Sequence, residues 1–311
     1  MASLTLAQAA LLTQDDLVMG VVKEIITVDL FASIIPFVPS ASANKVVNQE
    51  LTESGSGFLD INSTTNPTQA TFTRTSFPIG RIVGDVEVDD FEQATQSRFN
   101  DQMGIQTELK AKSIGRLYKS AIITGTGSFP QLTGISNLMD ASGVIQASST
   151  TTAGALTLAL LDELLDTVKS KDGEVDYIIM NSAMRRKYKA LVRSQGFDNE
   201  EVEVGFLDPL SGQRGTGKVI SYESIPIFRN DNIGTESTNG SPDKQRIFAG
   251  VFGEGVGLVG LQPGVGDPGI RVSLPFIHPT KDATVRRVKF YTGLALYNKW
   301  GLAELSNLTS A

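Results

Sequence analysis

The chain has 311 residues, of which 41% are hydrophobic and 20% are charged, and this composition is ordinary for a folded protein with a sizeable core. It has no cysteine, which excludes disulfides and thiolate metal sites, and its single histidine excludes a multi-histidine metal site. The net charge of −7 argues against tight DNA binding, because proteins that bind nucleic acid carry basic patches. No signal peptide and no apolar run of ~18 residues occurs, so a soluble protein without a membrane partner is expected.

The first part of the chain predicts a helical arm. Residues 5–28 repeat apolar side chains at helical spacing, and Pro36 and Pro39 end this pattern. We therefore expect residues 1–43 to form an N-terminal arm that leads into the fold.

Residues 44–84 are polar and predict a long extended loop in the form of a β-hairpin, with its tip at 62–67. Gly55 and Gly57 would let the loop bend. A two-stranded ribbon is marginally stable on its own, so this segment is expected to lie on another subunit. The alternative is a disordered loop.

A strand and a long helix are expected next. Residues 85–89 alternate acidic and apolar side chains, which indicates a half-buried strand. Residues 90–123 contain no proline and carry apolar residues at helical spacing, which predicts a spine helix of about 50 Å. The simpler alternative is a pair of helices broken at Gly104, because glycine weakens a helix.

The rest of the chain mixes helices and strands without a regular alternation, so the fold class is expected to be α+β. Helices are predicted over 156–168 and from a Ser182 cap to Arg193, the latter with a solvated basic face. Strands are predicted over 176–180, 217–229 and 245–262. Near the end, one strand face is expected to carry Val288, Phe290, Leu294, Leu296 and Trp300, and the other Arg287, Lys289 and Lys299.

Two glycine motifs suggest nucleotide binding but lack the required context. Residues 212–218 resemble a phosphate-binding loop, yet Val219 stands where a magnesium-binding hydroxyl is needed and a strand follows instead of a helix. Residues 255–260 spell a dinucleotide fingerprint, but a proline-glycine pair follows where a helix should begin. His278 lies between prolines, which favours a structural role. No catalytic residue, cofactor or metal is therefore predicted.

The order of these parts resembles the major capsid protein of tailed bacteriophages. This is the Hong Kong ninety-seven-type fold, which encapsulins and herpesvirus shell proteins share. The most family-like stretch is residues 124–135, where a Gly-x-Gly, a proline and a Gly-Ile pair follow the spine. Residues 176–182, followed by a basic helix, are similar to a passage of the family's axial domain.

The resemblance implies five parts and a structural function. These are an N-terminal arm (1–43), an extended loop (44–84), a peripheral domain with the spine helix (85–135), an axial domain (136–275) and a C-terminal return into the peripheral domain (276–311). The chain would assemble into hexamers and pentamers of a virion shell in the host bacterial cytoplasm. The predicted assembly contacts are Gly55, Gly57, Phe58, Arg74 and Arg81.

The resemblance also implies partners. Because only about 40 residues precede the extended loop, either a separate scaffolding protein or a chain that is already processed is expected. A portal and a cement protein are further expected partners, and DNA would be enclosed without specific binding. Some relatives lock their shells through a lysine on the extended loop, but no lysine occurs between Lys45 and Lys110, so a non-covalent shell is expected.

Two other functions fit the sequence. An encapsulin shell would use the same fold around protein cargo. A nucleotide-dependent enzyme would use one of the two glycine motifs.

Overall fold

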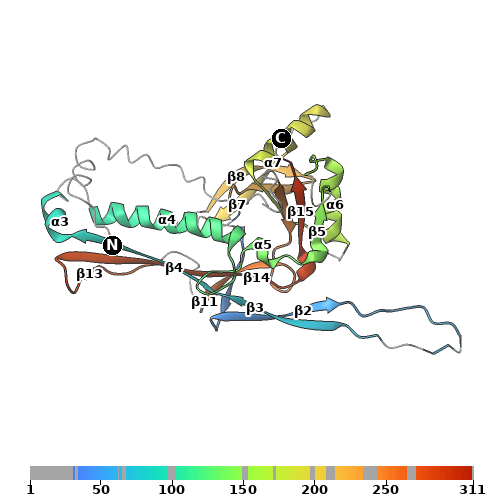
Figure 1. The fold of residues 1–311 in the computed structure, drawn as a ribbon, viewed down its shortest axis with the longest axis horizontal. Helices are drawn as coiled ribbons and strands as arrows, with labels where there is room; N and C mark the ends of the chain where they lie inside the picture. Colours follow the sequence, from blue (N-terminus) through green and yellow to red (C-terminus); the bar gives the residue numbers. More distant parts are fainter. Residues whose placement is uncertain are drawn as a thin grey trace.

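The computed structural model describes residues 31, 34–61, 63–64, 68–96, 102–148, 153–170, 173–196, 200–207, 214–233, 244–264 and 271–309. It combines helices with three β-sheets, which confirms the predicted α+β class (Figure 1). The predicted helix over 5–28 lies outside the described residues.

The six-stranded sheet is built around the long strand β14 (Ala283–Leu296). β14 runs antiparallel to β4 (Gly80–Asp89), from Ala283 opposite Asp89 to Thr292 opposite Gly80. The predicted alternation of residues 85–89 is confirmed, since Val86 and Val88 are buried. The other strands are β11 (Leu258–Pro263), β1 (Phe37–Ser40), β12 (Arg271–Val272) and β13 (Phe276–Ile277).

Helix α4 (Gln102–Thr124) lies along the β4–β14 pair (Figure 1). Its buried face includes Ile114, Tyr118 and Ile122, and the ring of Tyr118 meets Phe290 of β14 edge-on, with the centroids 4.9 Å apart. The main prediction was one continuous spine helix. The structure instead describes two helices, since a shorter helix, α3 (Asp90–Gln96), precedes α4. At 1.5 Å per residue α4 is about 35 Å long, and Gly104 lies inside it instead of at a break.

The seven-stranded sheet has the strand order β5-β15-β10-β6-β9-β8-β7. Its strands are β5 (Val144–Gln146), β6 (Tyr177–Met180), β7 (Glu201–Leu207), β8 (Arg214–Tyr222), β9 (Ile225–Arg229), β10 (Gln245–Gly250) and β15 (Leu302–Leu308). Two amphipathic helices, α6 (Leu158–Lys169) and α7 (Ser182–Ser194), bury their apolar sides in a core with this sheet. Short helical turns stand at α5 (Ile135–Leu138), η1 (Ala141–Gly143) and η2 (Lys299–Gly301).

A shared core joins the two large sheets. Phe31 is fully buried, with its ring centroid 5.0 Å from that of Tyr177 and 5.8 Å from that of Phe228, both in the seven-stranded sheet. The same cluster includes Leu261 and Leu294 of the six-stranded sheet. The two sheets are therefore held by one continuous apolar core.

The hairpin consists of β2 (Asn44–Thr52) and β3 (Thr71–Pro78), which form a separate antiparallel sheet. Figure 1 shows it projecting well beyond both large sheets. The predicted hairpin extended to residue 84, but residues from Gly80 onward pair with β14 as part of β4. The hairpin therefore ends at Pro78.

Three predictions near the C-terminal half need correction. The cap of α7 is Asn181, whose side chain accepts a hydrogen bond from the Met184 N–H at 2.9 Å, and Ser182 is the first helical residue. Trp300 lies in η2, because β14 ends at Leu296. Residues 276–311 do not all return to one sheet, since β15 lies inside the seven-stranded sheet between β5 and β10.

The position of the two glycines in α4 gives a test of the helix bounds. Gly115→Pro removes an internal hydrogen bond and should lower the free energy of unfolding by about 3 kcal/mol or more. Gly104→Pro is the matched control, because Gly104 lies in the first turn of α4, where proline is tolerated. Urea denaturation followed by circular dichroism measures both variants. Equal losses of stability would contradict the helix start at Gln102.

Candidate assembly interface

The root of the hairpin is fixed to the body of the protein. Val47 and Phe77 are buried in the shared core. The Gln49 side-chain amide donates to the Leu296 carbonyl at 2.7 Å, and the Lys299 ammonium donates to the Leu51 carbonyl at 3.0 Å. These contacts give β2 and β3 a defined direction as they leave the sheet.

The distal part of the hairpin carries apolar side chains into solvent. Phe58 is fully exposed, Ile61 is 89% exposed, and Leu59 and Phe72 are also exposed. Ser63 bonds to the Asp60 carbonyl through both its N–H, at 3.1 Å, and its hydroxyl, at 2.8 Å, which forms a turn at the tip. Exposed apolar groups gathered in this way are typical of a protein–protein contact.

The five predicted contact residues do not form one cluster. Gly55, Gly57 and Phe58 lie together in the distal hairpin, and the Gly55 carbonyl accepts a hydrogen bond from the Thr68 hydroxyl across it. Arg74 is exposed on β3 opposite Asn48. Arg81 was assigned to the extended loop, but it lies in β4 opposite Tyr291. The structure therefore separates Arg81 from the other four.

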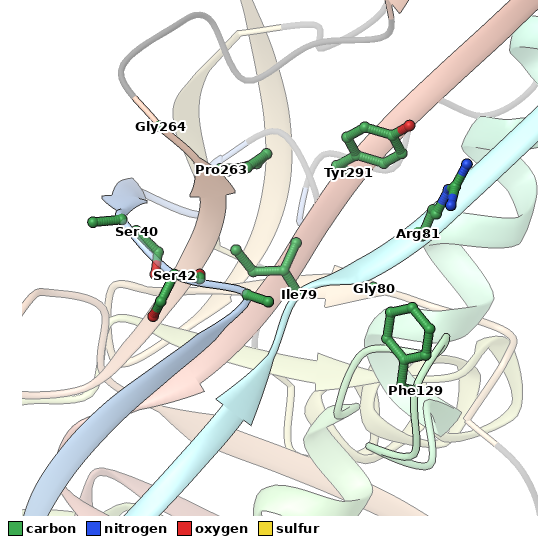
Figure 2. Close-up of a pocket in the computed structure, with 11 residues that line it drawn as sticks. Ser40, Ser42, Ile79, Gly80, Arg81, Phe129, Pro263, Gly264 and Tyr291 are labelled. Carbon is green, nitrogen blue, oxygen red and sulfur yellow. Dashed lines mark hydrogen bonds between the residues drawn. The ribbon is translucent and has the colours of Figure 1, made fainter.

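Arg81 borders an open pocket of about 540 Å³ at the root of the hairpin, which we call the hinge pocket (Figure 2). Its floor and rim combine Ile79 and Pro263 with the rings of Phe129 and Tyr291 and the hydroxyl groups of Ser40 and Ser42. The Arg81 guanidinium lies 5.8 Å from the centre of the Tyr291 ring. The pocket thus offers aromatic surface beside one positive charge.

The family-like segment 124–135 contributes Phe129 to this pocket. Within it, the Gly127 N–H donates to the Leu132 carbonyl at 3.0 Å and the Gly134 N–H to the Gly125 carbonyl at 2.8 Å. A Cβ on Gly125 would lie 2.4 Å from the Leu132 carbonyl oxygen, so only glycine fits this close approach. The Arg81 N–H donates to the Pro130 carbonyl at 2.9 Å, which places the exposed ring of Phe129 beside Arg81.

Two of the three acidic residues of β4, Asp85 and Glu87, form ion pairs within the chain. The Arg287 guanidinium donates to both carboxylate oxygens of Asp85, at 2.7 and 2.8 Å, and Lys281 lies 2.7 Å from Glu87. The bond from Arg287 lowers the pKa of the Asp85 carboxyl, and the bond from Lys281 lowers the pKa of the Glu87 carboxyl. These charges stabilise the β4–β14 pair and are not available to a partner.

The two glycine motifs lie in strands and a turn. Residues 214–218 belong to β8, where Lys218 stands opposite Glu203, so no helix N-terminus faces a phosphate. Residues 253–257 form a turn that leads directly into β11. Among the described residues no group of His, Asp and Glu could hold a metal ion, and no helix is long and apolar enough to cross a membrane.

His278 orders the tight connection between β13 and β14. Its N–H donates to the Ala283 carbonyl at 2.8 Å, and its ring nitrogen Nδ1 accepts from the Thr280 N–H at 3.2 Å. Both bonds hold the turn between β13 and β14, as the sequence predicted for a structural histidine.

Residues 83–226 match the family described as SU10 major capsid protein, and this region runs from β4 through α4 and segment 124–135 to the start of β9. The holo-SrpI encapsulin complex from Synechococcus elongatus PCC 7942 is similar in structure, with 19% identity, a TM-score of 0.70, and coverage of 93% of this chain and 90% of that chain. The chain has the Hong Kong ninety-seven-type capsid fold. The predicted resemblance to tailed-phage capsid proteins is thereby confirmed.

Viral and particle capsids share the same fold. The capsid of a native GTA particle is 16% identical with a TM-score of 0.63, and the match covers 91% of each chain. The capsid of Myoviridae phage XM1 is 13% identical with a TM-score of 0.57, and the match covers 90% of this chain and 92% of that chain. No curated protein matches the chain.

Sequence reasoning did not select two residues of the hinge pocket. Phe129 and Tyr291 line the hinge pocket with Arg81, although they are far from it in sequence. Their local patterns predict only a loop and a strand. The signal that was available is the glycine spacing around Phe129, which indicates a tight loop with an exposed aromatic residue.

The Asp85–Arg287 pair predicts a pH dependence. Because the folded pKa of Asp85 lies below its ordinary value of 3.8, the pair stabilises the fold above about pH 4, and this contribution is lost as the pH falls through the folded pKa. Asp85→Asn should lower the free energy of unfolding by about 1 kcal/mol at pH 7, a modest value because Arg287 is partly exposed. Urea titrations at pH 7 and pH 3 should show a smaller difference from the wild type at pH 3.

Asp60→Asn is the matched control, because Asp60 is exposed at the tip of the hairpin. It should unfold like the wild type at both pH values. A constant difference between Asp85→Asn and the wild type would refute the contribution of the ion pair.

Proposed function

We propose that the chain is the major capsid protein of a tailed bacteriophage, which assembles with copies of itself into the shell around the genome. The match of residues 83–226 to a major capsid protein family carries this proposal. The matched region includes most of β4, helix α4, and segment 124–135, which contributes Phe129 to the hinge pocket.

The surface of the chain supports a role in assembly. The distal hairpin exposes Phe58, Leu59 and Ile61, and burying such side chains contributes about 1.5–3 kcal/mol each. Copies of one chain that bury such a surface usually form closed, symmetric assemblies. A net charge of −7 suits a shell that encloses DNA without binding it tightly.

The proposal includes partners and a place of action. The shell would form in the bacterial cytoplasm as hexamers and pentamers and would become part of the virion. We propose a separate scaffolding protein, a portal and a cement protein as partners of the shell. The five parts predicted from the sequence remain our proposal for the domains, with the end of the extended loop corrected to Pro78 and the last part corrected at β15.

An encapsulin shell is the second candidate, because the similarity to the encapsulin of Synechococcus elongatus PCC 7942 has a TM-score of 0.70. An encapsulin would enclose protein cargo. The enzyme alternative has less support, because the described part of the first glycine motif lies in a strand.

Electron microscopy of the purified protein, alone and with its scaffolding protein, should show closed shells. Particles from infected cells should contain double-stranded DNA, measured by absorbance and nuclease protection after lysis. Shells filled with one packaged enzyme would support the encapsulin. A protein that stays monomeric at all concentrations with the scaffold present would contradict any shell function.

The mature shell should be held by non-covalent contacts only. The hairpin sequence, residues 44–78, contains one lysine, Lys45 at the root, where the ammonium lies 6.0 Å from the centre of the Tyr297 ring. The arginine residues of this region are poor nucleophiles because a guanidinium stays protonated in proteins. Mature particles boiled in detergent should run as a single band near 33.3 kDa. A ladder of multimers that resists boiling would refute this prediction.

A further inference from the structure

We propose that the tip of the hairpin docks into the hinge pocket of a second copy of the chain, where Asp60 of the tip pairs with Arg81 of the pocket. This inference rests on the proposed shell function. It assigns a receiving site to the exposed tip and an ion-pair partner to Arg81, which has none among the residues that the structure describes.

The tip combines apolar surface with one negative charge. Phe58, Leu59 and Ile61 are exposed around Asp60, and the turn closed by Ser63 holds them at the end of the ribbon. The Asp60 carboxylate accepts the Ile61 N–H at 2.7 Å, and it forms no ion pair with any residue that the structure describes. The tip therefore requires a site with aromatic or apolar walls and a positive charge.

The hinge pocket has this character. The pocket is open to the surface, and its volume of about 540 Å³ leaves room for a few side chains. Phe129, which is 74% exposed, and Tyr291 provide aromatic walls. Arg81 makes no ion pair with the described residues and lies beside both rings (Figure 2).

The tip cannot reach the pocket of its own chain. β2 has nine residues and alone extends about 30 Å from the root, and the chain continues outward to Asp60. Figure 1 shows the hairpin leading away from the sheets that border the pocket. The occupant is therefore the tip of another copy.

Docking of the hairpin tip of one copy into the hinge pocket of another is a head-to-tail contact, in which each copy uses two different surfaces. Such contacts form a closed ring when the rotation between copies closes and an open filament when it does not. The apolar side chains would supply the driving force, and the Asp60–Arg81 pair would fix the register. Rings of this kind are the units from which a closed shell can be built.

A second exposed apolar surface is less suited to receive the tip. At the β12–β13 edge, Leu274 is 86% exposed, and Ile277 is also exposed. One cation beside this edge, Arg287, lies 5.9 Å from the centre of the Phe276 ring and is already bonded through two nitrogens to Asp85. Arg287 is therefore not available to Asp60.

A charge exchange tests the pair. Asp60→Arg and Arg81→Asp should each raise the critical concentration for shell assembly several-fold, and the double variant should return it towards the wild-type value. Light scattering measures assembly, and circular dichroism confirms that each variant is folded. Arg74→Asp is the matched control, because Arg74 is an exposed cation outside the pocket and should not be rescued by Asp60→Arg. Rescue of Arg74→Asp, or failure to rescue Arg81→Asp, would overturn the proposal.

Introduced cysteines provide a second test, and no native disulfide can interfere because the chain has no cysteine. Shells that carry Asp60→Cys with Ser42→Cys should form multimers on a non-reducing gel after oxidation, since Ser42 lines the pocket. Asp60→Cys combined with Leu274→Cys tests the β12–β13 edge as the receiving site and should give no disulfide-linked multimers. Intact shells without a link between positions 60 and 42, or with a link between 60 and 274, would refute the docking while leaving the shell function in place. Absence of shells in the wild type would instead refute the proposed function.

Discussion

The pairing of β4 with β14 is the interaction on which the rest of the structure depends. Ten consecutive residue pairs join the two strands, and two ion pairs reinforce them along their acidic side. Helix α4 lies on this pair, and segment 124–135 is attached to it through the Arg81 N–H. Only Ile79 separates the hairpin from β4, so the direction of the hairpin is set where the pair begins.

The close fit at this junction explains why the hairpin leaves the body in a defined direction. A Cβ on Gly80 would lie 2.8 Å from the Leu132 nitrogen and 3.2 Å from the Thr292 carbonyl oxygen, so segment 124–135, β4 and β14 approach one another as only glycine allows. The same close approach forms the hinge pocket. A projecting ribbon and the pocket at its root are therefore two results of one packing arrangement.

The sequence predicted the elements whose patterns are local. The alternation of residues 85–89, the amphipathic helices near 158–169 and 182–194, and the polar hairpin all follow from spacing of apolar residues or from turn chemistry. β15 was missed because all its residues are buried, so the strand shows no alternation. Its polar residues also argue against a buried strand when only the sequence is considered. In the structure one of them, Glu304, is buried and lies 3.8 Å from Arg246 of the neighbouring strand β10.

The contact surfaces were only partly predictable for a related reason. The hairpin is one continuous segment, and the prediction that its distal part meets a partner came from its composition. The hinge pocket gathers residues near positions 40, 80, 129, 263 and 291, and no local pattern brings them together. Arg81 was selected as one of few cations, but its neighbours became visible only in the folded chain.

The central claim is that the distal hairpin is a binding surface completed by another copy of the chain. Hydrogen–deuterium exchange of residues 53–61, compared between the free subunit and the assembled shell, tests it most directly. The account predicts rapid exchange in the free subunit and strong protection in the shell, with β6 protected in both states because it is buried. Equal exchange of residues 53–61 in both states would contradict it.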